Sequence, residues 1–208
     1  MDMNLPRPTK IVCVGRNYVE HARELGNEVP ERPLIFLKPP SSLVADGDAV
    51  RIPAQSQRVE HEGEIAVVIG RRATDVREDE AWSYVAGIAP LNDVTARDLQ
   101  KSDGQWTRAK VFDTFCPMGR VVPLESVDRD ALEVVCRVNG QERQRGHVGQ
   151  MAFSIPVILA YVTSVMTLEP GDVVATGTPA GVGPLQPGDV VEVEIPGVGT
   201  LRNPVEAR

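Results

Sequence analysis

The sequence predicts an α+β domain that is mostly β, with a few helices at its periphery. Glycine (18 residues) and proline (17 residues) are abundant and spread along the chain, which suits many short strands better than a helical bundle. Apolar runs of strand length outnumber the helical patterns, of which there are about three. No repeat, charge block or low-complexity linker divides the 208 residues, so we expect one domain over 1–208.

Strand signals recur from one end of the chain to the other. The segment 59–70 begins with polar residues and ends in the apolar run Ile65–Ile69, which is typical of a buried strand. Asn139-Gly140 between two extended runs is a strong hairpin signal. The predicted strands are Ile11–Val14, Leu34–Leu37, Val59–Gly70, Val85–Asp93, Leu132–Val138, Glu142–His147, Val173–Ala175, Val190–Ile195 and Leu201–Asn203.

Two of the expected helices are marked by capping residues. Asn17 is a good N-cap and Gly26 a good stop for a short helix over 18–25. Ser154 is expected to cap a longer helix over 156–166, which has proline in its first turn.

Composition and charge exclude several classes of function. The net charge of −7 argues against a nucleic-acid surface and against binding to anionic membranes. Cys13, Cys116 and Cys136 are odd in number and lack C-x-x-C spacing, so we expect neither a disulfide framework nor a zinc site. The N-terminus lacks the apolar core of a signal peptide, and Ile155–Val165 is far short of the roughly 20 residues that cross a bilayer. A cytoplasmic protein is therefore expected.

The run Glu60-His61-Glu62-Gly63-Glu64 carries the first candidate site. Alternate residues of a strand share a face, so Glu62 and Glu64 are expected to point the same way, about 7 Å apart. Like charges so placed need neutralising, and a divalent cation would do this. A solvated strand end explains the same pattern about equally well. Glu60 is assigned to that solvated end, and His61, which faces the other way, to a structural role.

A third carboxylate, Asp93, follows the next apolar strand and would complete a hard oxygen site for Mg²⁺ or Mn²⁺. Directly after it, Thr95 to Asp98 match a capping box, so a helical turn is expected there, with Asp98 in a structural role. Arg97 and Gln100 share one face of that helix. They either lie on a solvated surface or bind substrate oxygens beside the metal.

Two further pairs of features are ambiguous when only the residues are considered. Lys110 stands before Phe112 and Phe115, and a lysine in an apolar setting needs a negative partner, although a surface lysine is the commoner case.

His21 and Glu24 are three residues apart on the first helix, and a histidine oriented by a carboxylate can act as a general base near pH 7. Lone pairs of this kind are usually surface pairs.

The glycine-rich segment 176–184 lacks the spacing of a phosphate loop or a dinucleotide fingerprint. A tight loop that presents N–H groups or a threonine hydroxyl to an anion fits it better. Nucleophile-elbow and H-E-x-x-H motifs are absent from the sequence.

In their order along the chain, these segments resemble the fumarylacetoacetate hydrolase family. The segments are VGRNYVEHARELG, FLKP, HEGEIAVVIG, LNDVTARDLQ, AKVFDTFCP and TGTPAGVGP. The resemblance runs from Ile11 to the C-terminus and is strongest to the short branch that includes acylpyruvases and oxaloacetate decarboxylases. Ala109 and Gly63 depart from the residues common in the family, but neither departure removes a ligand.

The resemblance implies a mixed β-roll or sandwich fold, usually assembled as a homodimer. Residues 17–26 would then form a lid helix, and 1–9 an N-terminal extension. The implied site residues are the metal ligands Glu62, Glu64 and Asp93, the substrate-binding residues Arg97, Gln100 and Thr178, and the catalytic residues His21, Glu24 and Lys110.

The expected chemistry follows from a cation that binds the carboxylate and keto oxygens of a small 2-oxo acid. Bond cleavage beyond C3 leaves a pyruvate enolate, which the cation and Lys110 can stabilise. We expect a hydrolase that cleaves a C–C bond of an acylpyruvate-type 2,4-dioxo acid and releases pyruvate, with His21 and Glu24 activating water. The alternatives are oxaloacetate decarboxylation or tautomerisation and isomerisation of 2-hydroxyhepta-2,4-diene-1,7-dioate. A non-catalytic protein that binds a metal or an organic acid ranks last.

Overall fold

The computed structural model describes residues 5–208, and this part of the chain contains sixteen strands and four α-helices. The strands are β1 (Ile11–Gly15), β2 (Leu34–Lys38), β3 (Leu43–Val44), β4 (Val50–Ile52), β5 (Val59–His61), β6 (Gly63–Ile69), β7 (Val85–Asn92), β8 (Thr95–Ala96), β9 (Cys116–Pro117), β10 (Val122–Pro123), β11 (Glu133–Val138), β12 (Gln141–His147), β13 (Val173–Ala175), β14 (Gly183–Pro184), β15 (Val190–Ile195) and β16 (Gly199–Ala207). The α-helices are α1 (Val19–Glu24), α2 (Arg97–Asp103), α3 (Thr107–Lys110) and α4 (Ile155–Val165). Short 3₁₀ helices occupy Pro40–Ser42, Glu78–Tyr84, Leu124–Ser126 and Val148–Gln150.

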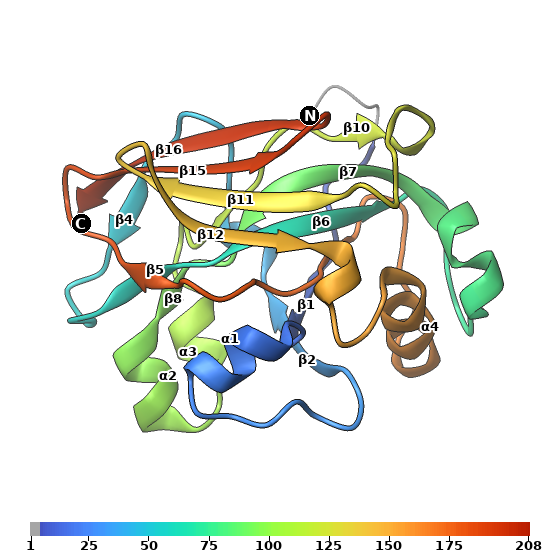
Figure 1. Cartoon of the computed structure of the whole chain (residues 1–208), viewed down its shortest axis with the longest axis horizontal. Helices are drawn as coiled ribbons and strands as arrows, with labels where there is room; N and C mark the ends of the chain where they lie inside the picture. The colour runs from blue at the N-terminus through green and yellow to red at the C-terminus, as the bar shows by residue number, and fades with distance from the viewer. Residues whose placement is uncertain (1–4) are drawn as a thin grey trace.

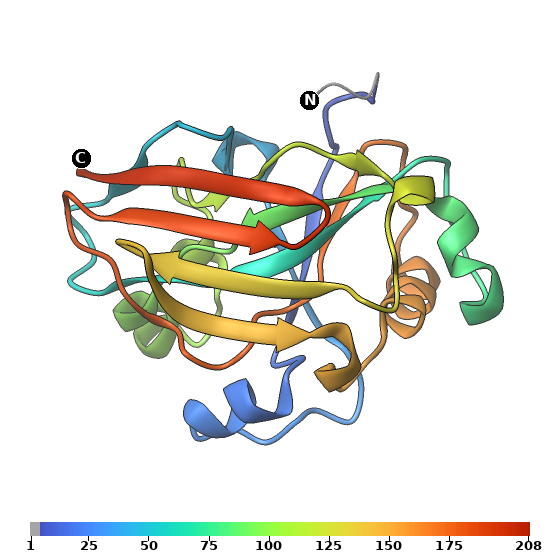
Figure 2. The ribbon, with the colours of Figure 1, turned by 45° about the horizontal axis from the view of Figure 1, so that its top comes forward.

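Two mixed sheets form the body of the protein. The six-stranded sheet has the order β10-β7-β6-β13-β1-β2, and the five-stranded sheet has the order β12-β11-β15-β16-β4. Each sheet combines antiparallel pairs with one parallel pair, β1 with β13 in the first and β16 with β4 in the second. Figure 2 shows β12, β11, β15 and β16 side by side, in front of β6 and β7. The mostly β, mixed fold class predicted from the sequence is confirmed.

The hydrophobic core lies between the two sheets and continues on the far side of the six-stranded sheet. On β6, Ile65 and Val67 belong to the cluster shared with β11 and β15. Ala66 and Val68 belong to a second cluster with residues of β1 and β13. β6 is thus buried on both faces, which explains why its sequence is a continuous apolar run without alternation.

Strand pairing breaks at Glu62, and this break prepares the site. β5 pairs not within the large sheet but in a small three-stranded sheet between β14 and β8. β6 pairs antiparallel with β7, so that Gly63 lies opposite Asn92. The backbone N–H of Asp93 then donates to the carbonyl oxygen of Glu62 at 2.8 Å. Acidic residues from two neighbouring strand ends therefore meet.

The helices cover the ends and one side of the sheets. Figure 1 shows α1, α2 and α3 together below the sheets, close to β5 and β8, and α4 at the opposite end of the molecule. α4 packs beside the 3₁₀ helix Glu78–Tyr84. None of the helices in the described part of the chain is long and apolar enough to span a membrane.

Three local signals are confirmed by the backbone. The Ser154 side chain accepts a hydrogen bond from the backbone of the third residue of α4. Gly26 follows α1 with a left-handed φ of +70°, as a helix stop should. Asn139 and Gly140 join β11 to β12 with φ values of +52° and +75°, which match a type I′ hairpin turn.

The cap predicted at Asn17 is wrong. Tyr18 occupies the N-cap position of α1, with no side-chain hydrogen bond to the helix. The Asn17 amide instead donates to the carbonyl oxygens of Phe153 and Thr176 and accepts from the Phe153 N–H. Burial explains the difference. The side-chain amide of Asn17 is fully buried, so its hydrogen-bonding groups need protein partners, and these lie in distant segments rather than at the end of the helix.

The capping box predicted at 95–98 is also wrong, although α2 does begin there. The Thr95 hydroxyl donates to the carbonyl oxygen of Asp93 instead of capping the helix. Asp98 accepts from the Ser56 hydroxyl at 2.6 Å and the Gln57 N–H at 2.8 Å, and so ties α2 to the segment before β5. Its role is structural, as expected, through a different contact.

Part of the expected N-terminal extension, residues 1–4, lies outside the described residues. Thr9, the last residue of the expected extension, is held by the buried carboxylate of Asp172. Both the backbone N–H and the hydroxyl of Thr9 donate to it.

Candidate active site

Three buried carboxylates converge where β5, β6 and β7 meet. Glu62 follows β5, Glu64 lies in β6 and Asp93 follows β7. Each offers an oxygen within 4.8 Å of the other two, and no residue of the three is more than 4% exposed. The expected uninterrupted strand through Glu62 and Glu64 is wrong, since pairing breaks at Glu62. The two side chains nevertheless reach the same point.

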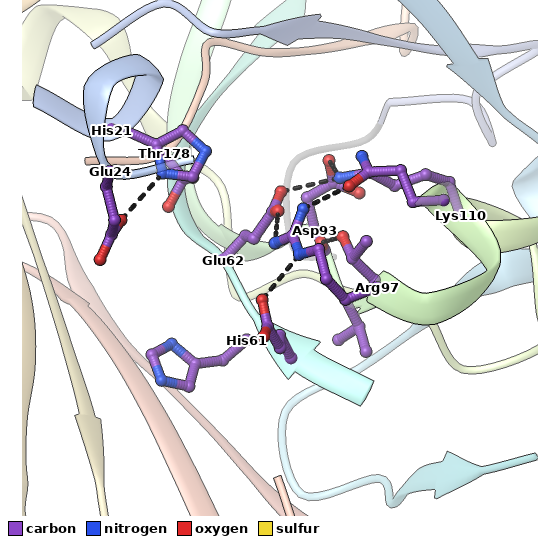
Figure 3. Close-up of polar contacts among 12 residues, drawn as sticks. His21, Glu24, His61, Glu62, Asp93, Arg97, Lys110 and Thr178 are labelled. Carbon is purple, nitrogen blue, oxygen red and sulfur yellow. Dashed lines mark hydrogen bonds and ion pairs between the residues drawn. The ribbon is translucent and has the colours of Figure 1, made fainter. Parts of the chain in front are cut away.

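Lys110 lies between two members of this triad. Its ammonium donates to Glu62 at 2.7 Å and to Asp93 at 2.6 Å, and the residue is 2% exposed. Figure 3 shows its side chain reaching from α3 toward both carboxylates. The surface alternative for Lys110 is therefore wrong, and the negative partners that a buried lysine requires are present.

Lys38 is a site residue that the sequence reasoning missed. At the end of β2 it is 1% exposed and donates to Asp93 at 2.5 Å and to the Val94 carbonyl at 3.2 Å. The signal for it existed, because a lysine that closes an apolar strand raises the same need for an anion as Lys110. It could not be paired with Asp93 from the sequence, since 55 residues separate them.

Arg97 is buried and is bound by two glutamates from the β5 segment. It donates to Glu60 and to Glu62 at 2.7 and 2.5 Å, and to the side-chain oxygen of Gln100 at 2.5 Å. The solvated role assigned to Glu60 is wrong, because this residue is only 1% exposed and holds Arg97 in place. Figure 3 shows His61 pointing away from the cluster, where it is buried and contacts Gln144. The structural role expected for His61 agrees with this position.

Positive neighbours keep Glu62 ionised. Burial raises its pKa, but Lys110 and Arg97 outweigh burial and hold the pKa well below its usual range. The same contacts act on Lys110, where burial lowers the pKa but Asp93 and Glu62 raise it above its usual value. The carboxylate form, which is the form that binds metals, is therefore present at neutral pH.

The donor set fits a hard divalent cation. Glu62 and Asp93 each bond to two cationic side chains. Glu64 bonds to no cationic side chain of residues 5–208. Its partner is the backbone N–H of Gly177 at 2.8 Å. Burial, and then the charges of Asp93 and Glu62, raise the pKa of Glu64 well above its usual value. Three oxygen ligands, one of them short of positive charge, are what Mg²⁺ or Mn²⁺ would satisfy.

The first helix brings a histidine to the same place. His21 is 5% exposed, and its Nδ1 lies 3.4 Å from Glu24. The Glu24 carboxylate also accepts the backbone N–H of Gly181 at 3.1 Å, so α1 is tied to the glycine-rich loop. Burial lowers the pKa of His21 and outweighs the opposing effect of Glu62, which leaves the imidazole neutral at pH 7. The surface-pair alternative therefore fails for His21, which is buried, whereas its partner Glu24 is exposed.

The glycine-rich loop 176–184 presents N–H groups to anions, and those anions are Glu64 and Glu24 of the same chain. Thr178 lies in this loop, where its hydroxyl donates to the Gly63 carbonyl at 2.9 Å and accepts from Gln144 at 2.7 Å. Gln144, from β12, was not foreseen. Gln144 and Thr178 are 34 residues apart in the chain, so no local pattern indicates their contact.

One cavity of about 580 Å³ unites these side chains, which is within the size range of small-molecule sites. All nine residues proposed from the sequence line it. Phe36 and Trp106 also line it, as does Arg16 directly after β1; the sequence reasoning assigned none of these three a role. A candidate metal site, two groups for proton transfer or charge stabilisation and amide donors therefore share one cavity.

Comparison with known proteins identifies relatives along almost the whole chain. The family model for the fumarylacetoacetate (FAA) hydrolase C-terminal domain matches residues 10–206. The mitochondrial oxaloacetate tautomerase FAHD1 of Arabidopsis thaliana is 47% identical over 205 residues, which cover 96% of this chain and 92% of that protein. The mitochondrial oxaloacetate decarboxylase of Dictyostelium discoideum is 44% identical over 197 residues, covering 92% and 90%.

A solved structure shows the same fold. The fumarylpyruvate hydrolase of Pseudomonas aeruginosa, crystallised in complex with Mn²⁺ and pyruvate, superposes with a TM-score of 0.93 at 32% sequence identity. The superposition covers 100% of this chain and 93% of that one.

Proposed function

This chain belongs to the fumarylacetoacetate hydrolase family, and from that premise we propose that it is a divalent-metal enzyme that converts a small 2-oxo acid by way of a pyruvate enolate. The observation that carries the proposal is the convergence of Glu62, Glu64 and Asp93 beside Lys110 in one cavity. Buried carboxylates and their ion pairs contribute little to the stability of a fold, so a functional site is the better explanation for this cluster.

Glu62, Glu64 and Asp93 would hold the cation, with Mg²⁺ or Mn²⁺ as the candidates for this oxygen-only ligand set. When bound, the cation supplies Lewis-acid polarisation of the substrate's carboxylate and keto oxygens. The Mn²⁺ in the Pseudomonas aeruginosa hydrolase supports the choice of a divalent ion.

Lys110 is placed to oppose the negative charge that develops as the enolate forms, because its ammonium already lies among the ligand carboxylates. Arg97 positions Gln100 by donating to its side-chain oxygen, which leaves the Gln100 amide N–H₂ as a donor for a substrate carboxylate. Thr178 can meet the same carboxylate once its hydroxyl releases the carbonyl oxygen of Gly63.

Hydrolysis of an acylpyruvate-type C–C bond is the first reaction that we propose, and the contact of the buried His21 with Glu24 supports it. Glu24 accepts a hydrogen bond from Nδ1, which leaves Nε2 as the basic nitrogen. Nε2 takes a proton from water, and the resulting hydroxide adds to the distal carbonyl. The C–C bond then breaks and its electrons pass to the pyruvate enolate. Return of the proton from Nε2 to C3 gives pyruvate and the free acid and restores the neutral imidazole.

Conversion of oxaloacetate is the second candidate, and the identity of 47% and 44% to an oxaloacetate tautomerase and an oxaloacetate decarboxylase favours it. Loss of CO₂ forms the same enolate without attack by water. Tautomerisation moves one proton between C3 and the oxygen on C2. Both reactions use Lys110 and the triad in the roles given above, so substrate and lid contacts decide between the candidates.

A substrate panel separates the two candidates. The purified protein with Mg²⁺ is incubated with acetylpyruvate, fumarylpyruvate or oxaloacetate, while pyruvate release and the keto–enol absorbance are followed. We expect pyruvate from an acylpyruvate, and a loss of this activity of at least about 100-fold in His21→Ala. The control is His147→Ala, since His147 lies outside the cavity.

Rapid oxaloacetate conversion with no turnover of either acylpyruvate would replace the hydrolase proposal by the second candidate. Full hydrolase activity in His21→Ala would remove His21 from its role as the base.

A further inference from the structure

The cavity contains a guanidinium that no carboxylate of residues 5–208 neutralises. Arg97 and Lys110 are bound by the acidic cluster, and Arg58 is paired with Glu60. Arg16 lines the same cavity and is half-buried. Within residues 5–208 its guanidinium contacts the ring of Trp106 rather than an acidic side chain. An unpaired, partly desolvated guanidinium is a binding group for an anion from outside the chain.

The backbone fixes the place of Arg16. It adopts a left-handed φ of +58°, which is unfavourable for a side-chain-bearing residue and is typical of functional positions. A Cβ on the preceding Gly15 would lie 2.6 Å from the Trp106 ring, so chain and indole pack tightly there. The next residue, Asn17, is locked by three hydrogen bonds. The backbone and the indole therefore position the guanidinium, with no ion pair to the described part of the chain.

An aromatic wall links Arg16 to the reaction centre. The Lys110 ammonium lies 5.0 Å from the centre of the Phe36 ring. Phe36 meets Trp106 edge to face, with ring centres 5.3 Å apart, and the Arg16 guanidinium lies 5.8 Å from the Trp106 ring. All four residues line the cavity, so a substrate held at the triad by its oxo-acid end can extend along this wall.

We propose that Arg16 binds the distal carboxylate of the substrate, so that the enzyme selects dicarboxylic over monocarboxylic 2-oxo acids. This inference rests on the proposed function for the end of the substrate that meets the triad. Arg16 is thus a specificity-determining residue, whereas Lys110 and His21 act on the reacting atoms.

Matched pairs of inert ligands test Arg16 without requiring turnover. 2-Oxopentanoate and 2-oxopentanedioate, and the seven-carbon pair 2-oxoheptanoate and 2-oxoheptanedioate, differ only in the distal carboxylate. Their dissociation constants are measured by calorimetry with saturating Mg²⁺. In the wild type we expect one of the dicarboxylates to bind roughly tenfold to a hundredfold more tightly than its partner.

Arg16→Gln should reduce that preference to within about twofold while the monocarboxylate affinity stays unchanged. Arg16→Asn provides the same test in a residue that tolerates a left-handed φ, in case the glutamine variant fails to fold. The matched control is Lys101→Gln, because Lys101 is an exposed cation that lines the same cavity. Lys101→Gln should keep the preference for the dicarboxylate. That result would show that the preference does not come from the overall positive charge of the cavity.

No dicarboxylate preference in the wild type, full preference in Arg16→Gln, or an equal loss in Lys101→Gln would each overturn the proposal. Because binding is measured, a preference that depends on Arg16 establishes the inference even if acylpyruvates are not turned over. Conversely, turnover without the preference defeats the inference and leaves the proposed function in place.

Discussion

The three carboxylates of the site differ in what neutralises them. Asp93 contacts Lys38 and Lys110, and Glu62 contacts Lys110 and Arg97, whereas from residues 5–208 Glu64 receives only a backbone N–H. A buried carboxylate without a cation is costly, and this cost is why burial and the neighbouring carboxylates raise the pKa of Glu64.

Replacing Lys38 by methionine tests the buried contact with Asp93. Removing one partner of a buried pair costs up to about 3–5 kcal/mol, and less here because Lys110 remains on Asp93. We expect a lower melting temperature in Lys38→Met, partly restored by Mg²⁺. Lys101→Met, at an exposed position, should change stability by no more than about 0.5 kcal/mol. Equal melting temperatures for the two variants would contradict the contact.

The pH dependence of hydrolysis tests the state of His21. Burial disfavours the imidazolium and lowers the pKa below its usual value of 6.5. A base is active when neutral, so kcat/KM should fall only as the pH drops through this lowered pKa, and the acid limb should lie below pH 6.5. Kinetics between about pH 5 and pH 8 measure the limb. A limb centred above pH 6.5 would show that Glu24 and Glu62 dominate over burial instead.

Among the elements, short interruptions and loops position the site more than the long strands do. The break at Glu62 frees β5 from the large sheet, and the loop 176–184 then receives Glu64 and Glu24 through backbone N–H groups. The loop therefore contacts both the candidate metal site and α1.

Three of the local signals at this scale were followed by the backbone, whereas the caps expected at Asn17 and Thr95 were not. Gly26, the Asn139-Gly140 turn and Ser154 act within a few residues, and the backbone follows each of them. Asn17 was misassigned because its partners lie more than a hundred residues away, and Glu60 because its burial depends on Arg97 from another element. Sequence patterns alone do not encode such contacts.

The start of β1 provides a stability test outside the site. The buried Asp172 carboxylate accepts five hydrogen bonds, four from Thr9 and Lys10 and one from the Glu169 N–H. Asp172→Ala should therefore cost at least about 1.5–3 kcal/mol at pH 7 and lower the melting temperature.

The loss should depend on pH. Burial raises the pKa of Asp172, but the bonds from Lys10, Glu169 and Thr9 outweigh it and lower the pKa below 3.8. Stability from a lowered carboxyl pKa is present above the unfolded value and disappears as the pH falls through the folded value. The melting-temperature gap between wild type and Asp172→Ala should thus narrow in acid. A melting-temperature difference that does not change with pH would show that Asp172→Ala loses stability through packing and not through the charge of the carboxylate.

At the scale of the whole molecule, the fold brings together residues that the sequence disperses. The site residues found by motif reasoning range from His21 to Thr178, and the two-sided burial of β6 supplies the rigid base on which they meet. Their order along the chain predicted the family, whereas the roles of Lys38 and Arg16 required the folded structure. Assembly as a homodimer stays a prediction, which light scattering in solution checks.

The central claim is that Glu62, Glu64 and Asp93 hold one divalent cation, and Mn²⁺ titration of wild type and Glu64→Gln tests it most directly. We predict a single Mn²⁺ per chain in the wild type and in the exposed control Glu142→Gln. Affinity should fall at least about 100-fold in Glu64→Gln. The metal-free melting temperature of that variant should be equal or higher, because a charge repelled by Asp93 and Glu62 is gone. Wild-type Mn²⁺ affinity in a folded Glu64→Gln protein would contradict the account.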